Sequence, residues 1–194
     1  VPLYLDEWKI DLAYSCSQKG LSCPPGLGPF SMNERAENKM SHRKDKVPNW
    51  YLDVSLLNKY WGSDRVYHHT APVNMNFGIR EALRLLAEEG LEVSWERHSK
   101  NAKLLWNSLE NIGLELQVKE ELRLPTLTTV KIPEGCDGKA FAKHLLNNFG
   151  VEIGGGLGDL AGKVWRIGLM GYNSTSANVD KIINLFETEL PKFR

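Results

Sequence analysis

The sequence has no excess of charge of either sign. Lys plus Arg and Asp plus Glu both number 24 among 194 residues, so the formal net charge is +0. Proteins that bind nucleic acid or anionic membranes usually carry clustered positive charge. No apolar run approaches the roughly 20 residues that span a bilayer, and the charged start Val1–Trp8 is not typical of a secretory signal. We therefore expect a soluble protein with no nucleic-acid partner and no membrane partner.

Cysteine is also scarce. Cys16, Cys23 and Cys136 are an odd number of thiols without the spacing of a metal site or a disulfide framework. We interpret them as free thiols, which suits a reducing compartment.

The segment Tyr67-His-His-Thr70 contains the only adjacent histidines. Successive side chains on extended backbone point to opposite faces, and no third ligand lies nearby, so we expect no metal site. The phenol of Tyr67 and the hydroxyl of Thr70 can both donate hydrogen bonds to an anion such as a phosphate. The alternative for Thr70 is a turn that enters the following helix.

One lysine stands among small and hydroxyl-bearing residues in the stretch Tyr14-Ser-Cys-Ser-Gln-Lys19-Gly-Leu-Ser-Cys-Pro-Pro-Gly26. It follows a short expected strand and precedes a Pro-Pro-Gly turn. An amine whose polar neighbours carry no opposite charge can have a lowered pKa and lose its proton. The neutral amine is the form that attacks a carbonyl to make a Schiff base. Lys19 is therefore a candidate nucleophile. The alternative is an ordinary surface lysine in a Ser/Gly-rich loop.

The spacing of apolar residues predicts five helices and several short strands. Helices are expected at 33–40, 74–90, 91–112, 137–150 and 175–190, and strands at 11–14, 28–32, 114–118, 126–132, 151–153 and 164–170. The second half is thus an α+β unit with a small sheet covered by helices, and we place a domain boundary near Gly90. The aromatic-rich segment 50–61 is interpreted as a packing or subunit-contact segment.

Arg166 lies within an otherwise apolar expected strand, where an unpaired charge is costly, so we expect an anionic partner. A structural carboxylate and a substrate carboxylate are both compatible with this residue. The glycine run Gly154–Gly158 lacks the βαβ frame of a dinucleotide site. It is either a flexible hairpin loop or backbone that approaches a ligand closely.

Seven motifs occur in order along essentially the whole chain, and together they resemble the alanine:glyoxylate (serine:pyruvate) aminotransferases, class-V, fold-type I enzymes that use pyridoxal phosphate. They are Ser15-Cys-Ser-Gln-Lys19, Pro24-Pro-Gly26, Trp61-Gly62, Tyr67-His-His-Thr70, Arg123-Leu-Pro-Thr-Leu-Thr-Thr129, Gly155-Gly-Leu-Gly158 and Arg166-Ile-Gly-Leu-Met-Gly171. Cys16 departs from the family pattern, which commonly has glycine there.

The resemblance implies a role for each matching residue. Lys19 corresponds to the lysine that binds the cofactor as a Schiff base and moves the substrate proton. Gln18 corresponds to a residue that lines the cofactor pocket, and Arg166 to the arginine that binds the substrate carboxylate. Tyr67 and Thr70 correspond to residues that contact the cofactor phosphate of the other subunit, which implies a homodimer.

The resemblance also implies an α/β fold, with residues 1–90 as the C-terminal portion of the large cofactor-binding domain and 91–194 as a small α+β domain. The implied reaction moves an amino group from alanine or serine to glyoxylate or pyruvate. A 3-hydroxykynurenine transaminase and a catalytically inactive dimerisation module are the alternatives. We expect the chain to be the C-terminal half of such an enzyme and inactive alone, in a peroxisomal or mitochondrial compartment.

Overall fold

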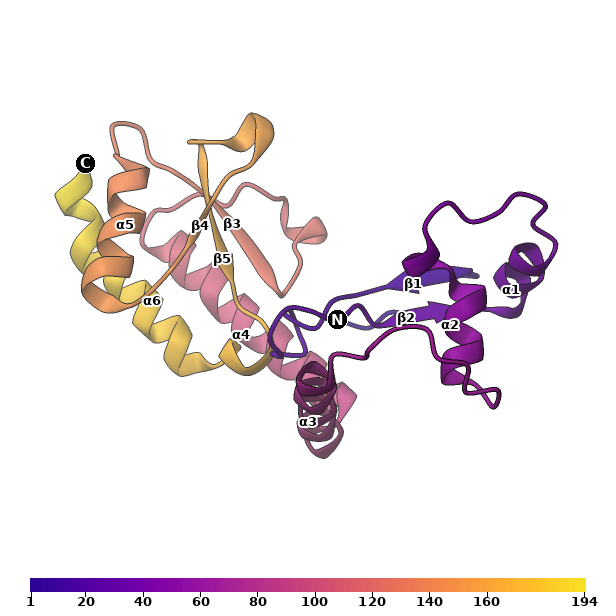
Figure 1. The fold of residues 1–194 in the computed structure, drawn as a ribbon. Helices are drawn as coiled ribbons and strands as arrows, with labels where there is room; N and C mark the ends of the chain where they lie inside the picture. Colours follow the sequence, from indigo (N-terminus) through magenta and orange to yellow (C-terminus); the bar gives the residue numbers. More distant parts are fainter. The chain divides into compact units, whose positions relative to one another are not determined.

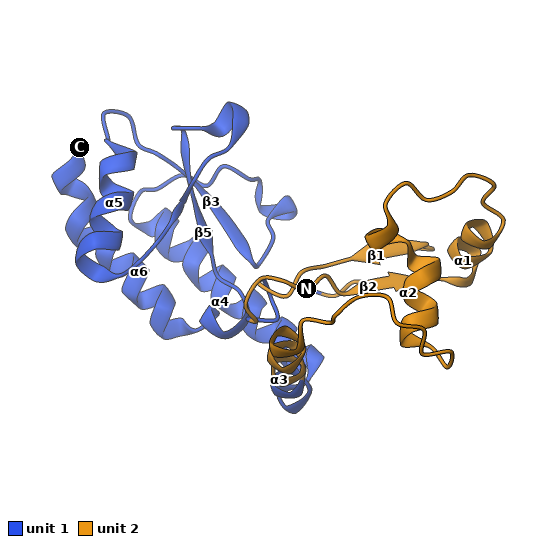
Figure 2. Ribbon diagram, viewed as in Figure 1, with its two compact units in different colours: residues 1, 19–22, 84–194 blue, residues 2–18, 23–83 orange.

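The computed structural model describes residues 1–194 (Figure 1). The chain divides into two compact units (Figure 2). One unit contains residues 1, 19–22 and 84–194, and the other contains residues 2–18 and 23–83. The short segment with the candidate lysine therefore belongs to the same unit as the C-terminal half of the chain.

The unit that contains the C-terminal half is built on a three-stranded antiparallel sheet in the order β3-β5-β4. Its strands are β3 (Leu127–Lys131), β4 (Gly154–Gly155) and β5 (Val164–Gly168). Arg166, in the central strand, pairs with Thr129 on one side and with Gly154 on the other. The helices of this unit are α4 (Leu91–Asn111), α5 (Gly138–Phe149) and α6 (Ser176–Glu189), with single 3₁₀ turns at Glu120–Leu122, Gly158–Leu160, Gly171–Asn173 and Leu190–Phe193.

Local capping chemistry sets the ends of these helices. The side chains of Asp137 and Thr175 accept hydrogen bonds from the backbone amides of Ala140 and Asn178, at 2.9 and 3.2 Å, and so satisfy free donors of the first turn. Gly150 ends α5 in the left-handed conformation, with φ 63°. The helices expected from Asp137 to Gly150 and after Thr175 are confirmed.

The core of this unit lies between the sheet and its helices. Successive side chains of a strand point to opposite faces, so Trp165 and Ile167 enter the core while Arg166 between them lies on the other face. The buried hydrophobic residues come from every helix and from both long strands: Ala102, Leu105, Trp106, Leu109, Leu114, Leu116, Val130, Phe141, Leu145, Ile153, Trp165, Ile167, Leu169, Val179, Ile182, Leu185, Phe186 and Leu190.

Two expected strands are wrong. The segment 114–118 makes only an isolated bridge, between Leu116 and Val130, because its alternation reflects the burial of Leu114 and Leu116 and not a continuous ladder. The third strand is Gly154–Gly155 and not 151–153. Glycine, which has low strand propensity, pairs here with β5 because its bare backbone fits beside the Arg166 side chain.

The other unit contains the two-stranded antiparallel sheet of β1 (Leu12–Tyr14) and β2 (Phe30–Met32). Asn33 caps α1 (Glu34–Ser41), and Asp53 caps α2 (Val54–Trp61). A 3₁₀ turn covers Trp50–Leu52, and the long helix α3 (Val73–Glu89) starts in this unit and ends in the other.

Aromatic rings pack together in this second unit. The ring of Trp50 stacks on that of His68, with 4.1 Å between centroids, and Tyr60 lies edge-on to Tyr67 at 6.1 Å. Rings of the aromatic-rich segment therefore contact one another, but Trp50, Tyr51 and Trp61 are each more than half exposed. The expectation of a packing or subunit-contact segment stays a prediction. No helix of the chain has the length and apolar character needed to cross a membrane.

Two neighbouring leucines of α5 test the position of the core. The Leu145 side chain is 0% exposed, whereas Leu146 is 47% exposed. Leu145→Ala should lower the free energy of unfolding by about 2–5 kcal/mol because it leaves a cavity, and Leu146→Ala should change it by about 0.5 kcal/mol or less. Urea denaturation measures both, and equal losses in the two variants would contradict this helix orientation.

Candidate active site

Lys19 lies in a tight turn. The backbone amide of Ser22 donates to the carbonyl of Lys19 at 2.9 Å, and Ser22 itself has a positive φ of 55°. The Lys19 side chain is exposed in this chain, and Gln18 beside it is exposed as well. The turn thus presents a primary amine to solvent, where an incoming carbonyl compound can reach it.

Ser17 fixes the beginning of the lysine loop. Its side chain is 0% exposed, and its hydroxyl donates to the carbonyl of Pro24 at 2.7 Å. The backbone amide of Cys23 donates to the carbonyl of Ser17 at 3.1 Å. These two bonds close the chain on itself across residues 18–22, so the lysine is held in a short constrained loop.

The lysine loop also contacts the turn that follows β5. The backbone amide of Tyr172 donates to the hydroxyl of Ser22 at 2.8 Å. A Cβ on Gly171 would lie 2.0 Å from the Ser22 hydroxyl oxygen and 2.9 Å from the carbonyl oxygen of Gly20. Gly171 has φ 59°, a left-handed conformation that favours glycine. Only glycine therefore allows the two backbone segments to approach this closely.

Arg166 projects from the centre of the sheet on the face opposite the core. Its Nε donates to the carbonyl of Gly155 at 2.6 Å, and no ion pair of the chain includes it. Of the two partners considered for this arginine, the chain does not supply the structural carboxylate. A Cβ on Gly154 would lie 3.3 Å from the guanidinium Nη2, so the glycine run leaves room for the arginine side chain.

Tyr67 and Thr70 lie together, as their spacing suggests. The phenol oxygen is 3.0 Å from the Thr70 hydroxyl oxygen, and Tyr67 is 71% exposed. The expectation for the two histidines between them is wrong in one respect. Their Nδ1 atoms lie 2.9 Å apart instead of on opposite faces, because the chain bends at His69 and is not extended. Two hydroxyls at this separation can donate to neighbouring oxygens of one anion.

The five candidate residues are distributed over the two units. Lys19 and Arg166 belong to the unit with the three-stranded sheet, and Gln18, Tyr67 and Thr70 belong to the other. Lys19 offers a primary amine and Arg166 a guanidinium, whereas Tyr67 and Thr70 offer two hydroxyl donors.

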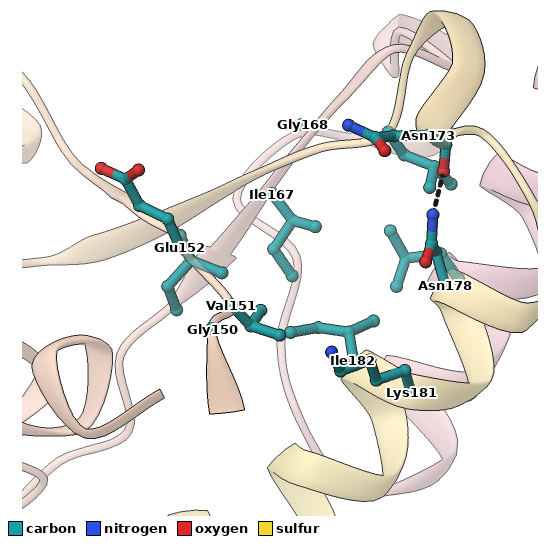
Figure 3. Close-up of a pocket in the computed structure, with 12 residues that line it drawn as sticks. Gly150, Val151, Glu152, Ile167, Gly168, Asn173, Asn178, Lys181 and Ile182 are labelled. Carbon is teal, nitrogen blue, oxygen red and sulfur yellow. Dashed lines mark hydrogen bonds between the residues drawn. The ribbon is translucent and has the colours of Figure 1, made fainter. Parts of the chain in front are cut away.

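One cavity of the chain lies apart from the five candidate residues. A cavity of about 230 Å³ lies between the end of β5 and α6 and is lined by Ile167, Asn173, Asn178 and Lys181 among others (Figure 3). The Asn178 amide donates to the carbonyl of Asn173 at 2.9 Å. Ile167 points to the helix-covered face of the sheet, so this cavity is separate from the face that carries Arg166.

A protein-family model described as aminotransferase class-V matches residues 1–182. The chain belongs to the class-V aminotransferase family. It is 49% identical over 185 residues to an alanine–glyoxylate aminotransferase of Callithrix jacchus, a match that covers 93% of this chain and 45% of that protein. The resemblance inferred from the seven motifs is confirmed.

Solved structures of the family give the same result. An alanine–glyoxylate aminotransferase from Nostoc sp. is 62% identical with a TM-score of 0.94, covering 96% of this chain and 50% of that one. A ureidoglycine–glyoxylate aminotransferase from Bacillus subtilis is 39% identical with a TM-score of 0.96, covering 99% and 50%. The chain therefore has the fold-type I architecture, and it spans about half the length of these relatives.

Sequence reasoning missed the residues that hold the lysine loop. Ser17 and Ser22 were included in the lysine stretch without a role, and Gly171 was only the last residue of a motif. The available signal was the repeated glycine after Arg166, since Gly168 ends the strand and Gly171 begins the turn that follows it. His98 of α4 is buried, with 6% exposure, and both of its ring nitrogens are hydrogen-bonded.

Two serines of one motif provide a matched test of the loop. Ser17→Ala removes a buried donor and leaves the Pro24 carbonyl without it, which should lower the free energy of unfolding by about 1–2 kcal/mol. Ser15 is exposed and its hydroxyl makes no hydrogen bond within the chain, so Ser15→Ala should change stability by about 0.5 kcal/mol or less. Chemical denaturation of both variants measures the difference, and a neutral Ser17→Ala would show that the hydroxyl does not hold the loop.

Proposed function

We propose that this chain provides the lysine and the carboxylate-binding arginine of a pyridoxal phosphate-dependent transaminase. The observation that carries the proposal is Arg166, a guanidinium with no carboxylate partner in the chain, on the open face of a sheet in a class-V aminotransferase. An arginine in this situation is suited to bind the carboxylate of an amino or oxo acid through two parallel hydrogen bonds.

The residues present fit pyridoxal phosphate by the chemistry of their donors. Lys19 offers an exposed amine for the aldehyde, and the hydroxyls of Tyr67 and Thr70, 3.0 Å apart, offer donors for the phosphate. Once bound, the cofactor supplies an electron sink for the substrate α-carbon. Lys19 then serves as the general base that removes the α-proton and returns it, while Arg166 orients the substrate.

The exposure of Tyr67 and Thr70 supports the proposal that they reach the phosphate of a second subunit in a homodimer. Gln18 is proposed to line the cofactor pocket next to the lysine. Residues 1–90 are proposed to be part of the large cofactor-binding domain and 91–194 the small domain, since α4 begins directly after Gly90. The family resemblance favours a peroxisomal or mitochondrial compartment.

Glyoxylate is the proposed amino acceptor. The names of the relatives at 49% and 39% identity both specify it, although their amino donors differ. Alanine is the proposed donor because the more similar relatives carry alanine in their names. Ureidoglycine is the second candidate, and rates with the two donors measured side by side on one preparation distinguish them.

A labelling experiment tests the role of Lys19. Incubation with pyridoxal phosphate followed by borohydride should leave a stable secondary-amine adduct on Lys19, found by peptide mapping. Lys19→Arg should abolish this adduct and, in the whole enzyme of which this chain is proposed to be the C-terminal half, reduce transamination by roughly 10²-fold or more. Lys103→Arg, which changes another exposed lysine, should leave both unchanged. Label distributed evenly over surface lysines would contradict the assignment.

Kinetics test Arg166 independently. Arg166→Lys keeps the positive charge but loses the two-pronged geometry. In the whole enzyme of which this chain is proposed to be the C-terminal half, KM for the oxo acid should therefore rise about 10- to 100-fold, the loss expected for one charge-assisted hydrogen bond. Arg35, an exposed arginine paired with Asp11, provides the control, and Arg35→Lys should leave KM unchanged. An unchanged KM in Arg166→Lys would exclude this arginine as the carboxylate-binding residue.

A further inference from the structure

His98 occupies an unusual position for a histidine of a long surface helix. It lies on α4, its side chain is 6% exposed, and both ring nitrogens are hydrogen-bonded. Nδ1 lies 2.6 Å from the carbonyl oxygen of Ser94, and Nε2 lies 2.8 Å from the backbone amide nitrogen of Gly171. A carbonyl can only accept and an amide can only donate. The partners therefore assign the proton to Nδ1 and leave Nε2 as the acceptor in a neutral ring.

The neighbouring polar residues of α4 bind the same turn. Arg97 Nη1 donates to the carbonyls of Gly171 and Ser174, at 3.0 and 2.7 Å. Asn101 donates to the Ser174 carbonyl at 2.8 Å. The amide of Gly171 is thus bonded to His98 and its carbonyl to Arg97, two consecutive residues of α4.

An ion pair keeps Arg97 in place for this task. Its Nη2 donates to Glu89 Oε2 at 2.9 Å. This hydrogen bond raises the pKa of Arg97 and lowers the pKa of Glu89. Arg97 remains charged, and a charged donor forms the stronger bond to a carbonyl.

The turn held in this way is the one that fixes the lysine loop. The amide of Tyr172, next to Gly171, donates to the Ser22 hydroxyl, and the amide of Ser22 donates to the Lys19 carbonyl. Three hydrogen bonds therefore lead from the His98 ring to the backbone of Lys19. The same turn follows β5, the strand that carries Arg166.

We propose that His98 is a positioning residue, which as a neutral imidazole fixes the Gly171 turn and thereby the loop that carries Lys19. The role of His98 in catalysis rests on the proposed function, whereas the hydrogen bonds that connect it to the Lys19 loop do not. Protonation of Nε2 would place two donors against each other at Gly171. The hydrogen bond from Gly171 to Nε2 therefore forms only while the ring is neutral.

The surroundings of His98 keep it neutral. Burial lowers its pKa below the ordinary 6.5 and the charge of Arg97 acts in the same direction, while the bond to the Ser94 carbonyl and the charge of Glu89 oppose them. Because the folded-state pKa is the lower one, the stability that this group contributes is complete above about pH 6.5 and is lost as the pH falls through the folded value. The hydrogen bond between Gly171 and His98 should be lost as the pH falls from 6.5 through the folded-state pKa.

Two substitutions separate the hydrogen bond from simple packing. His98→Leu fills the space but offers no acceptor, whereas the amide oxygen of His98→Gln can accept from Gly171. In His98→Leu, amide exchange at Gly171 and Tyr172 should rise about tenfold or more, as expected for one lost hydrogen bond, and trypsin should cleave faster after Lys19. His98→Gln should recover most of the protection. Amides of the core strand β3 should exchange as in the unmodified protein.

Leu105→Ala, a core substitution on the same helix, controls for a general loss of stability. It should loosen all amides of the unit together and not Gly171 and Tyr172 selectively. Nitrogen-15 shifts of the His98 ring should show a protonated Nδ1 and a bare Nε2 at pH 8. A protonated Nε2, or wild-type protection and cleavage in His98→Leu, would overturn the proposal. Amide exchange, trypsin cleavage and nitrogen-15 shifts need neither cofactor nor substrate, so failure of this proposal is distinct from failure of the proposed transaminase activity.

Discussion

The hydrogen bonds that hold the Gly171–Ser174 turn on α4 are the constraint on which the rest of the candidate site depends. His98 and Arg97 bond the amide and the carbonyl of Gly171, and Asn101 bonds the carbonyl of Ser174. Because the ring of His98 is buried and the guanidinium of Arg97 is paired, water competes poorly for these bonds. The turn is therefore a rigid support for the Ser22 hydroxyl, and the lysine loop rests on it.

The position of Arg166 depends on the sheet, because successive side chains of a strand point to opposite faces. Trp165 and Ile167 fill the core, so Arg166 must emerge on the opposite face. Two side chains of this short strand thus stabilise the unit, and the side chain between them presents a guanidinium on the other face. The glycines of β4 and the loop after it leave room for that arginine, and the carbonyl of Gly155 orients its Nε.

Much of the fold could be read from the sequence, because helix ends are decided by neighbouring residues. Asp137, Thr175 and Gly150 act within four residues of themselves, and the helices they bound appear where expected. The strands predicted at 114–118 and 151–153 were wrong because a strand forms only where a second segment of the chain pairs with it. Burial of Leu114 and Leu116 produces the same alternation as a ladder, and nothing local distinguishes the two.

The candidate site divides in the same way. The order of the seven motifs was enough to identify the family without coordinates, and the same residues supplied the candidates Lys19 and Arg166. How the lysine is held could be seen only in the folded chain, because each hydrogen bond joins distant residues. The separation is 150 residues for Ser22 and Tyr172, and 73 residues both for His98 and Gly171 and for Asn101 and Ser174. Local patterns record propensity and burial, whereas a hydrogen bond between distant segments exists only after the core has brought them together.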